Sequence, residues 1–149
     1  TGAFYANSYV RMADFIDGTS TTAIIGERDT LTCKSGTWIG LVNPQGTGSR
    51  GISMVSGYAQ PRLNAPPDPQ LGVQHALGCA EGFSSLHFGG AQFAFADGSV
   101  RFISNGIGYK YINTSGGAAS GVNDFKSNQN GPYQLMMSRA DRNPIPNLD

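Results

Sequence analysis

The side chains that could do chemistry gather in one stretch, FSSLHFGGAQFAFADGSVRFIS, residues 83–104. His87 and Asp97 lie ten positions apart in it, and Ser84 and Ser85 come just before the histidine. A histidine and a carboxylate could act together as a general acid and base, or as ligands of a metal ion. Their cooperation depends on the elements that hold them.

The Asp97-Gly98 pair indicates a β-hairpin, because Asp-Gly between alternating runs suits a tight turn with positive φ angles. We predict a two-residue turn there, with two aromatic side chains, Phe93 and Phe102, facing each other across the strands. Three cross-strand pairs follow from this turn: Ala96–Ser99, Phe95–Val100 and Phe93–Phe102. The opposite face would then be shallow, with Ala94 and Ala96 beside Ser99 and Arg101, and would suit close approach by a partner.

The same hairpin predicts that His87 and Asp97 lie apart. The strand from Ala91 to Asp97 covers about 20 Å at ~3.3 Å per residue. Gly89 and Gly90 can turn the chain but cannot return His87 over that distance. We therefore interpret Asp97 as a turn residue, with calcium ligation as the alternative. His87 is interpreted as a hydrogen-bonding residue that fixes the strand entry, with a binding role as the alternative.

Other chemical motifs are missing or incomplete. The chain has no G-x-S-x-G nucleophile elbow and no phosphate-binding loop that ends in Lys-Ser or Lys-Thr. The acids Asp14 and Asp17 lack the spacing of a calcium-binding EF-hand loop, and His75 with His87 is insufficient for zinc. We predict a protein that is not an enzyme, with no catalytic residue, no metal and no cofactor; a structural calcium ion is the alternative.

Composition favours an extracellular domain rich in strands and loops. The 149 residues suit one domain, and ten basic and ten acidic residues cancel, so no net charge attracts nucleic acid. Charged residues make up only 13%, whereas there are 21 glycines. No apolar run approaches the roughly 18 residues that span a bilayer. We expect any export signal or membrane anchor to have been removed or to lie outside this chain.

The two cysteines, Cys33 and Cys79, have neither zinc-site nor redox-motif spacing. A disulfide between them is favoured over two buried free thiols. It would close a long loop, contribute roughly 4 kcal/mol on the chain-entropy account, and place the protein in an oxidising compartment.

The remaining pattern predicts an α+β fold. Apolar spacing between Ser8 and Gly18 predicts a short helix with Tyr9, Met12 and Ile16 on one face. A second short helix is expected near Pro132, with Asn130 as its cap and Tyr133, Met136, Met137 and Ala140 on one face. Strands are expected at 21–27, 37–42 and 51–58, in addition to the hairpin. The proline-rich run 59–72 is expected to cross the surface, residues 113–131 to form a long loop, and 140–149 an extended tail. Together these elements predict a single β-rich domain over 1–149, an antiparallel sheet of about five strands with short flanking helices.

Aromatic residues leave a second class of function open. Trp38, Tyr58, Tyr109 and Tyr111 could present ring faces to a glycan, or could be core and edge residues of the β domain.

Several segments together resemble one known family. His87, nine intervening residues and Asp97-Gly98 match the pattern that names the prepilin-type processing-associated H-x(9)-D-G family, which is abundant in planctomycetes and their relatives. DFIDGTSTTAIIGE, YAQPRLNAPP and the late YQLMMSRA also resemble segments of that family. The resemblance extends over most of residues 1–140.

The resemblance implies a pilin-like or pseudopilin-like protein of a type IV pilus or type II secretion assembly. Such proteins carry a hydrophobic N-terminal helix followed by a β-rich C-terminal head, and this sequence corresponds to the head portion without that helix. The expected function is that of a structural subunit outside the cell or in the envelope, which acts through contacts with copies of itself or other subunits. The alternative is an extracellular glycan- or solute-binding module.

Overall fold

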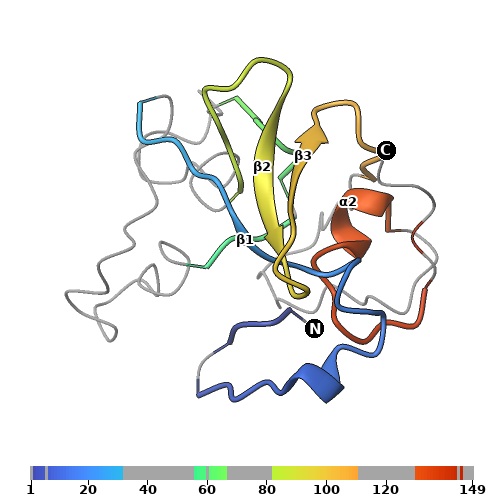
Figure 1. Ribbon diagram of the computed structural model, residues 1–149. Coiled ribbons are helices and arrows are strands. Elements are labelled where there is room, and N and C mark those ends of the chain that lie inside the picture. The colour runs from blue at the N-terminus through green and yellow to red at the C-terminus, as the bar shows by residue number, and fades with distance from the viewer. Residues whose placement is uncertain are drawn as a thin grey trace, which may run out of the picture.

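The computed structural model describes residues 2–5, 7–31, 56–59, 61–66, 82–110, 130–143 and 145. In this part of the chain a small antiparallel sheet has the strand order β1-β2-β3. The strands are β1 (Ala23–Gly26), β2 (Gly90–Phe95) and β3 (Val100–Ser104), as Figure 1 shows. Helical structure is limited to η1, a 3-10 turn over Met12–Asp14, and α2 over Pro132–Leu135. The architecture is thus mixed, with a three-stranded sheet and little helix.

The predicted hairpin is confirmed, but its predicted register is wrong by one residue. The observed partners are Phe93 with Arg101 and Ala94 with Val100. The turn contains three residues, because Gly98 N donates to the Phe95 carbonyl and Phe95 N donates to the Ser99 carbonyl. Gly98 has φ +85°, the left-handed conformation that ends a three-residue hairpin loop with a bulge.

This register changes which face each β3 side chain occupies, because neighbouring residues of a strand point to opposite sides. Phe93 is fully buried, whereas Phe102 lies opposite Gln92 on the outer face and is half exposed. The predicted Phe93–Phe102 stack is therefore absent. Arg101 takes the place opposite Phe93, and its guanidinium lies 4.7 Å from the ring centre of Phe95.

The core lies on the inner face of the sheet. Ala91, Phe93 and Phe95 of β2 are at most 1% exposed, and Ile103 of β3 is equally buried. Tyr133 and Met136 of the α2 segment complete this core, with α2 beside the sheet in Figure 1. The ring of Phe83 packs edge-on against Phe93, with ring centres 5.2 Å apart.

The outer face of the sheet carries a row of apolar side chains, which we call the outer row. Ile25 of β1 pairs with Ala94 of β2, which pairs with Val100 of β3. Ile25, Val100 and Phe102 are exposed. Ala94 thus lies on the predicted shallow face, but its neighbours there are apolar and not the predicted Ser99 and Arg101. Ala96 lies in the turn, partly buried.

The predicted helix between Ser8 and Gly18 is wrong. Only Met12–Asp14 forms a single 3-10 turn, and Tyr9, Met12 and Ile16 are exposed. The Asp14 carboxylate accepts the backbone N–H of Arg11 and so caps the start of this turn, but the turn does not continue as a helix beyond Asp14. Helical spacing of apolar residues does not produce a helix where no apolar surface receives that face.

The predicted C-terminal helix is confirmed in a shorter form. Pro132 occupies its first turn, and Gly131 rather than Asn130 precedes it. Tyr133 and Met136 are fully buried as expected. Residues 140–143 and 145 belong to no helix or strand.

Other predictions lie outside the described residues: Cys33, Cys79 and His75, the strand at 37–42, residues 51–55 of the strand at 51–58, and most of the 113–131 loop. Residues 56–58 are described and form no strand. Within the described ranges, no helix has the length and apolar character needed to cross a membrane.

Candidate functional site

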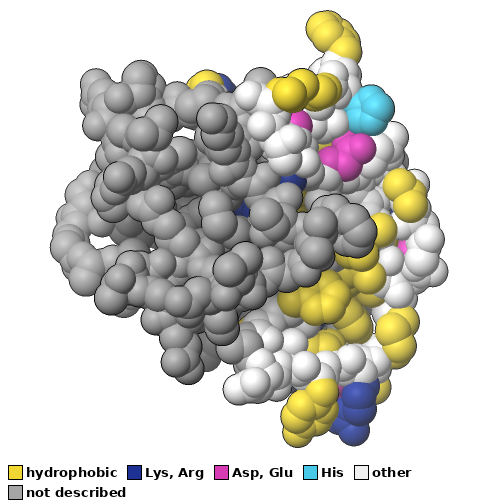
Figure 2. Space-filling view, turned by 90° about the vertical axis from the view of Figure 1, so that its left-hand side faces the viewer, with side chains coloured by type: hydrophobic (Ala, Val, Ile, Leu, Met, Phe, Trp, Pro, Cys, Tyr) yellow, Lys and Arg dark blue, Asp and Glu magenta, His cyan; other side chains and the backbone are white. Residues whose placement is uncertain are grey.

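The segment DFIDGTSTTAIIGE, which ends at Glu27, and the stretch 83–104, which contains His87, lie in contact through these two residues. Glu27 follows β1 directly, and His87 lies in the loop that leads into β2. His87 Nε2 lies 3.4 Å from Glu27 Oε1, and the two side chains are 59% and 35% exposed. Figure 2 shows the histidine beside an acidic side chain at the surface. We call this pair, with the hydrogen bonds that hold it, the clasp.

Glu27 is fixed chiefly by backbone contacts. Its N–H donates to the Gln92 carbonyl over 3.2 Å, and its Oε2 accepts the Gln92 N–H over 2.8 Å. The carboxylate thus replaces the carbonyl that an ordinary strand pair would offer. The Glu27 carbonyl in turn accepts the N–H of Ser84. The clasp extends the pairing of β1 with β2 by one residue and attaches the following loop to it.

The electrostatics of the clasp favour an ionised glutamate. Partial burial by itself raises the pKa of Glu27. The hydrogen bonds from the Gln92 backbone and from Ser85, together with His87, outweigh that effect and hold the pKa below its ordinary value.

Two asparagines fix the loop that bears His87. Asn64 Oδ1 accepts the N–H of Ser85 over 2.7 Å, and Asn64 Nδ2 donates to Asn105 Oδ1 over 2.7 Å. At the far end of the loop, Asn105 N donates to the Gly89 carbonyl over 2.8 Å. Asn64 holds the left-handed φ of +54°, which asparagine tolerates better than most residues. The described part of the proline-rich segment thus helps to hold the loop that bears His87.

Asp97 lies at the other end of β2, in the hairpin turn (Figure 1). Its Oδ1 accepts both the N–H of Ser99 (2.9 Å) and its hydroxyl (2.7 Å). These hydrogen bonds lower the pKa of Asp97, and Arg101 at 3.8 Å acts in the same direction. His87 and Asp97 therefore bind different partners at opposite ends of one strand and form no common site.

A second acidic residue, Asp17, anchors the C-terminal segment. Its two carboxylate oxygens accept the N–H groups of Asp141 (2.7 Å) and Arg142 (2.8 Å). Nearby, the fully buried Thr22 donates to the carbonyl of Gly18 or Ser138. Two further hydrogen bonds join the segment DGTSTT (17–22) to the hairpin turn. The Thr22 carbonyl accepts the N–H of Ala96, and the Thr19 carbonyl accepts the N–H of Asp97. The carboxylate of Asp17, a residue considered above as a calcium ligand, thus accepts hydrogen bonds from backbone N–H groups.

The described part of the chain contains no group of three or more His, Cys, Asp or Glu side chains placed to hold a metal ion. Of the aromatic candidates, Tyr58 is exposed and Tyr109 packs against Tyr133, with ring centres 6.4 Å apart. Trp38 and Tyr111 lie outside the described residues.

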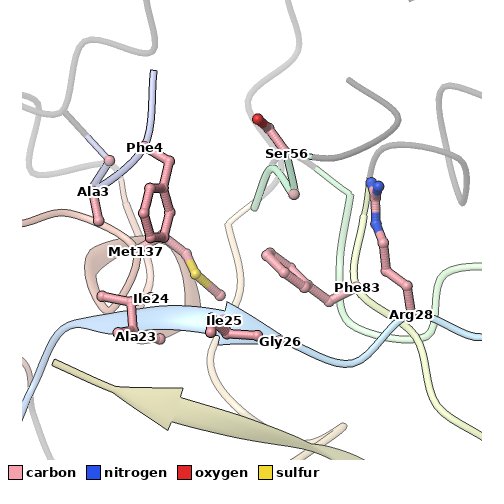
Figure 3. Close-up of a pocket in the computed structure, with 12 residues that line it drawn as sticks. Ala3, Phe4, Ala23, Ile24, Ile25, Gly26, Arg28, Ser56, Phe83 and Met137 are labelled. Carbon is pink, nitrogen blue, oxygen red and sulfur yellow. The ribbon is translucent and has the colours of Figure 1, made fainter. Parts of the chain in front are cut away.

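A cavity beside β1 was not anticipated from the sequence. It encloses about 350 Å³ between β1, the segment around Phe4, the segment around Ser56, and Phe83. In Figure 3 the ring of Phe83 and the thioether of Met137 point toward the space above β1, with Phe4 on one side and Arg28 on the other. Five separate segments line it, so no local sequence pattern could have revealed it.

Glu27 and Asn64 were also missed as site residues. The Gly-Glu that ends the first motif was a signal for Glu27, since a carboxylate directly after a strand is well placed to accept a neighbouring N–H. Asn64 had only its position between prolines as a signal.

These features describe a small antiparallel sheet whose motif residues bind the backbone of the protein itself. Its family is shown by sequence comparison: residues 1–109 match the model SBP_bac_10, described as "Protein of unknown function (DUF1559)", and the chain belongs to this family. Comparison with curated proteins and with solved structures gave no match.

Proposed function

We propose that the protein is a non-enzymatic, pilin-like or pseudopilin-like structural subunit that acts through contacts with other protein chains, among them copies of itself. We infer a location outside the cell or in the envelope, from the low charge and high glycine content. The finer architecture we propose is a pilin-like head with a sheet of about five strands, two more than the described residues contain.

The observation that carries this proposal is the outer row. Ile25, Ala94 and Val100 are direct neighbours across three strands, and Phe102 follows Val100 on the same face. Ile25 and Val100 are 63% and 64% exposed. Apolar side chains grouped on a regular sheet face mark a surface for protein contact. Figure 2 shows further hydrophobic side chains at the surface of the described part.

The polar motif residues support the same reading. A catalytic group must have atoms free for a substrate, whereas Glu27, Asp17 and Asp97 direct their carboxylate oxygens to backbone N–H groups of the protein itself. Their arrangement suits a rigid structural unit.

Sedimentation velocity of the full chain over a wide concentration range tests the proposal. We expect association that weakens when Val100 and Phe102 are both replaced by Ser, and that is unchanged by Tyr9→Ser, a matched exposed residue away from the sheet. A stable monomer at every concentration, with no partner subunit, would count against the proposal.

The cavity beside β1 supports a second candidate, an extracellular module that binds a glycan or another solute. Its volume of about 350 Å³ lies at the lower end of the range for small-molecule sites. Glycan-array binding that is lost on Phe4→Ala, which removes an aromatic ring from the cavity lining, would favour this candidate over assembly.

A further inference from the structure

Phe88 is held out into solvent by a fixed loop. It is 103% exposed, and Leu86, two residues earlier, is 66% exposed. We call these two side chains the knob. Soluble proteins expose single apolar residues often, but a phenylalanine with no protein contact gains no burial energy in the isolated chain.

The loop that bears the knob is held by hydrogen bonds on both sides of Phe88. Between the two apolar residues, His87 is tied to Glu27 by its ring and to Ser85 Oγ by its backbone N–H. Gly89 is tied to Asn105 and has φ +82°. These contacts fix the chain on both sides of Phe88. An aromatic side chain on a rigid support loses little entropy on binding, as is typical of interface hot spots.

The cavity beside β1 has the chemistry to receive such a side chain. Its lining is largely apolar, and Met137 and Phe83 point toward the space above β1 in Figure 3. An inserted ring could contact the sulfur of Met137 and the edge of Phe83, both of which are favourable partners for an aromatic ring. The knob contributes no residue to the cavity lining, so the two are separate surfaces of one molecule.

We propose that Phe88 of one copy inserts into the cavity beside β1 of a second copy. The inference rests on the proposed function as a self-assembling subunit and names the contact. Charge supports two like copies: the chain has a net charge of +0, so copies do not repel one another. Glu27 at the base of the knob and Arg28 in the cavity lining are consecutive residues, so each half of the contact borders one acidic and one basic residue, and Glu27 of one copy can face Arg28 of the other.

The area that one insertion buries is small compared with that of a stable interface. Burial of one phenylalanine removes about 150–250 Å² of its surface from water, and the cavity walls contribute a similar amount. A stable isolated complex needs roughly 1,200 Å² in total. One insertion is therefore weak by itself, and it gains effect where it repeats or where the outer row adds to it. Because knob and cavity are different surfaces, the contact can run head to tail and build an open array.

Site-specific photo-crosslinking tests the contact directly. The full chain carries p-benzoylphenylalanine in place of Phe88 and is mixed as isotopically light and heavy copies before irradiation. We expect light–heavy crosslinked peptides that contain Met137, Phe4 or Ile25. The photoreactive residue at position 9, equally far out in solvent, is the control and should give no crosslink to the cavity.

Two variants provide an independent measurement. We expect Phe88→Ser to weaken self-association about tenfold or more without any loss of thermal stability, since the side chain is fully exposed in the described part of the chain. Phe4→Ser, which removes an apolar wall of the cavity at a residue that is 64% exposed, should weaken association to a similar degree, whereas Tyr9→Ser should not.

The results separate this inference from the proposed function. Wild-type association that survives Phe88→Ser, or crosslinks that map away from the cavity, would overturn the knob contact and leave assembly by another surface. Crosslinks only within one copy would overturn it as well. A wild-type chain that does not associate at all would overturn both.

Discussion

Glu27 illustrates how a single side chain can do the work of a backbone group. Its Oε2 accepts the Gln92 N–H at the point where β1 has ended, and its Oε1 faces His87. His87 is the first residue of the sequence pattern that ends at Asp97-Gly98, yet its side chain is more exposed than that of Glu27. The physical contributions of the two residues should therefore differ.

We expect Glu27→Ala to lower the free energy of unfolding by about 1–3 kcal/mol, because it leaves a strand N–H without its acceptor. His87→Ala should lower it by less than about 1 kcal/mol, because an exposed ion pair contributes little. Urea denaturation of both variants measures the difference. If the histidine variant were the less stable one, the clasp would not act as described.

The clasp also predicts a dependence of stability on pH. Folding lowers the pKa of Glu27 below its ordinary 4.5, so the folded state binds this proton less tightly than the unfolded state does. Glu27 therefore stabilises the fold above pH 4.5, and this contribution is lost as the pH falls through the folded pKa. The lowered pKa values of Asp14 and Asp97 act in the same direction, whereas burial raises the pKa of Asp141, which acts in the opposite direction.

Glu27→Gln isolates the glutamate from these other groups. The difference in unfolding free energy between wild type and this variant should be largest near neutral pH and should shrink on acidification. Urea titrations at a series of pH values measure it. A difference that stays constant down to strongly acidic pH would contradict an ionised Glu27 in the clasp.

At the scale of elements, the hairpin shows how one turn residue decides which side chains form the core. The three-residue turn places Phe93 inside and Phe102 outside, although both belong to alternating aromatic runs. With a two-residue turn, both would have faced the same side.

Two alanine variants distinguish the registers. Phe93→Ala should cost about 3–5 kcal/mol of unfolding free energy, because the ring is 1% exposed and its loss leaves a cavity. Phe102→Ala should cost about 1 kcal/mol or less, since that ring is 46% exposed. Chemical denaturation measures both free energies of unfolding. Equal losses in the two variants would contradict the three-residue turn and favour a two-residue turn.

At the scale of the whole molecule, the C-terminal segment depends on contacts more than a hundred residues away in sequence. Asp17 holds Asp141 and Arg142, and the Met136 carbonyl accepts the N–H of Ala23 at the start of β1. The segment thus joins the sheet through the DGTSTT motif.

Asp17→Ala should cost roughly 1–3 kcal/mol, because two amides lose a charged acceptor. Hydrogen exchange should quicken at residues 139–143 and stay slow in β2. Asp17→Asn, which keeps one acceptor oxygen, should have a smaller effect. Faster exchange throughout the hairpin, with residues 139–143 unaffected, would show that Asp17 has another role.

The sequence by itself determined the local features of this protein. Asp97-Gly98 specified a hairpin turn because glycine readily adopts the left-handed φ that such a turn needs, and Pro132 specified a helix start because its φ is already helical. The separation of His87 from Asp97 followed from the length of an extended strand. Only the tertiary structure decided the hairpin register, the partners Glu27 and Asn64, and the cavity beside β1. The last three join segments distant in the chain, and contacts of that kind depend on packing, which local residue preferences do not encode. The register is local, but it depends on whether the turn takes two or three residues, and the Asp-Gly pair is compatible with both.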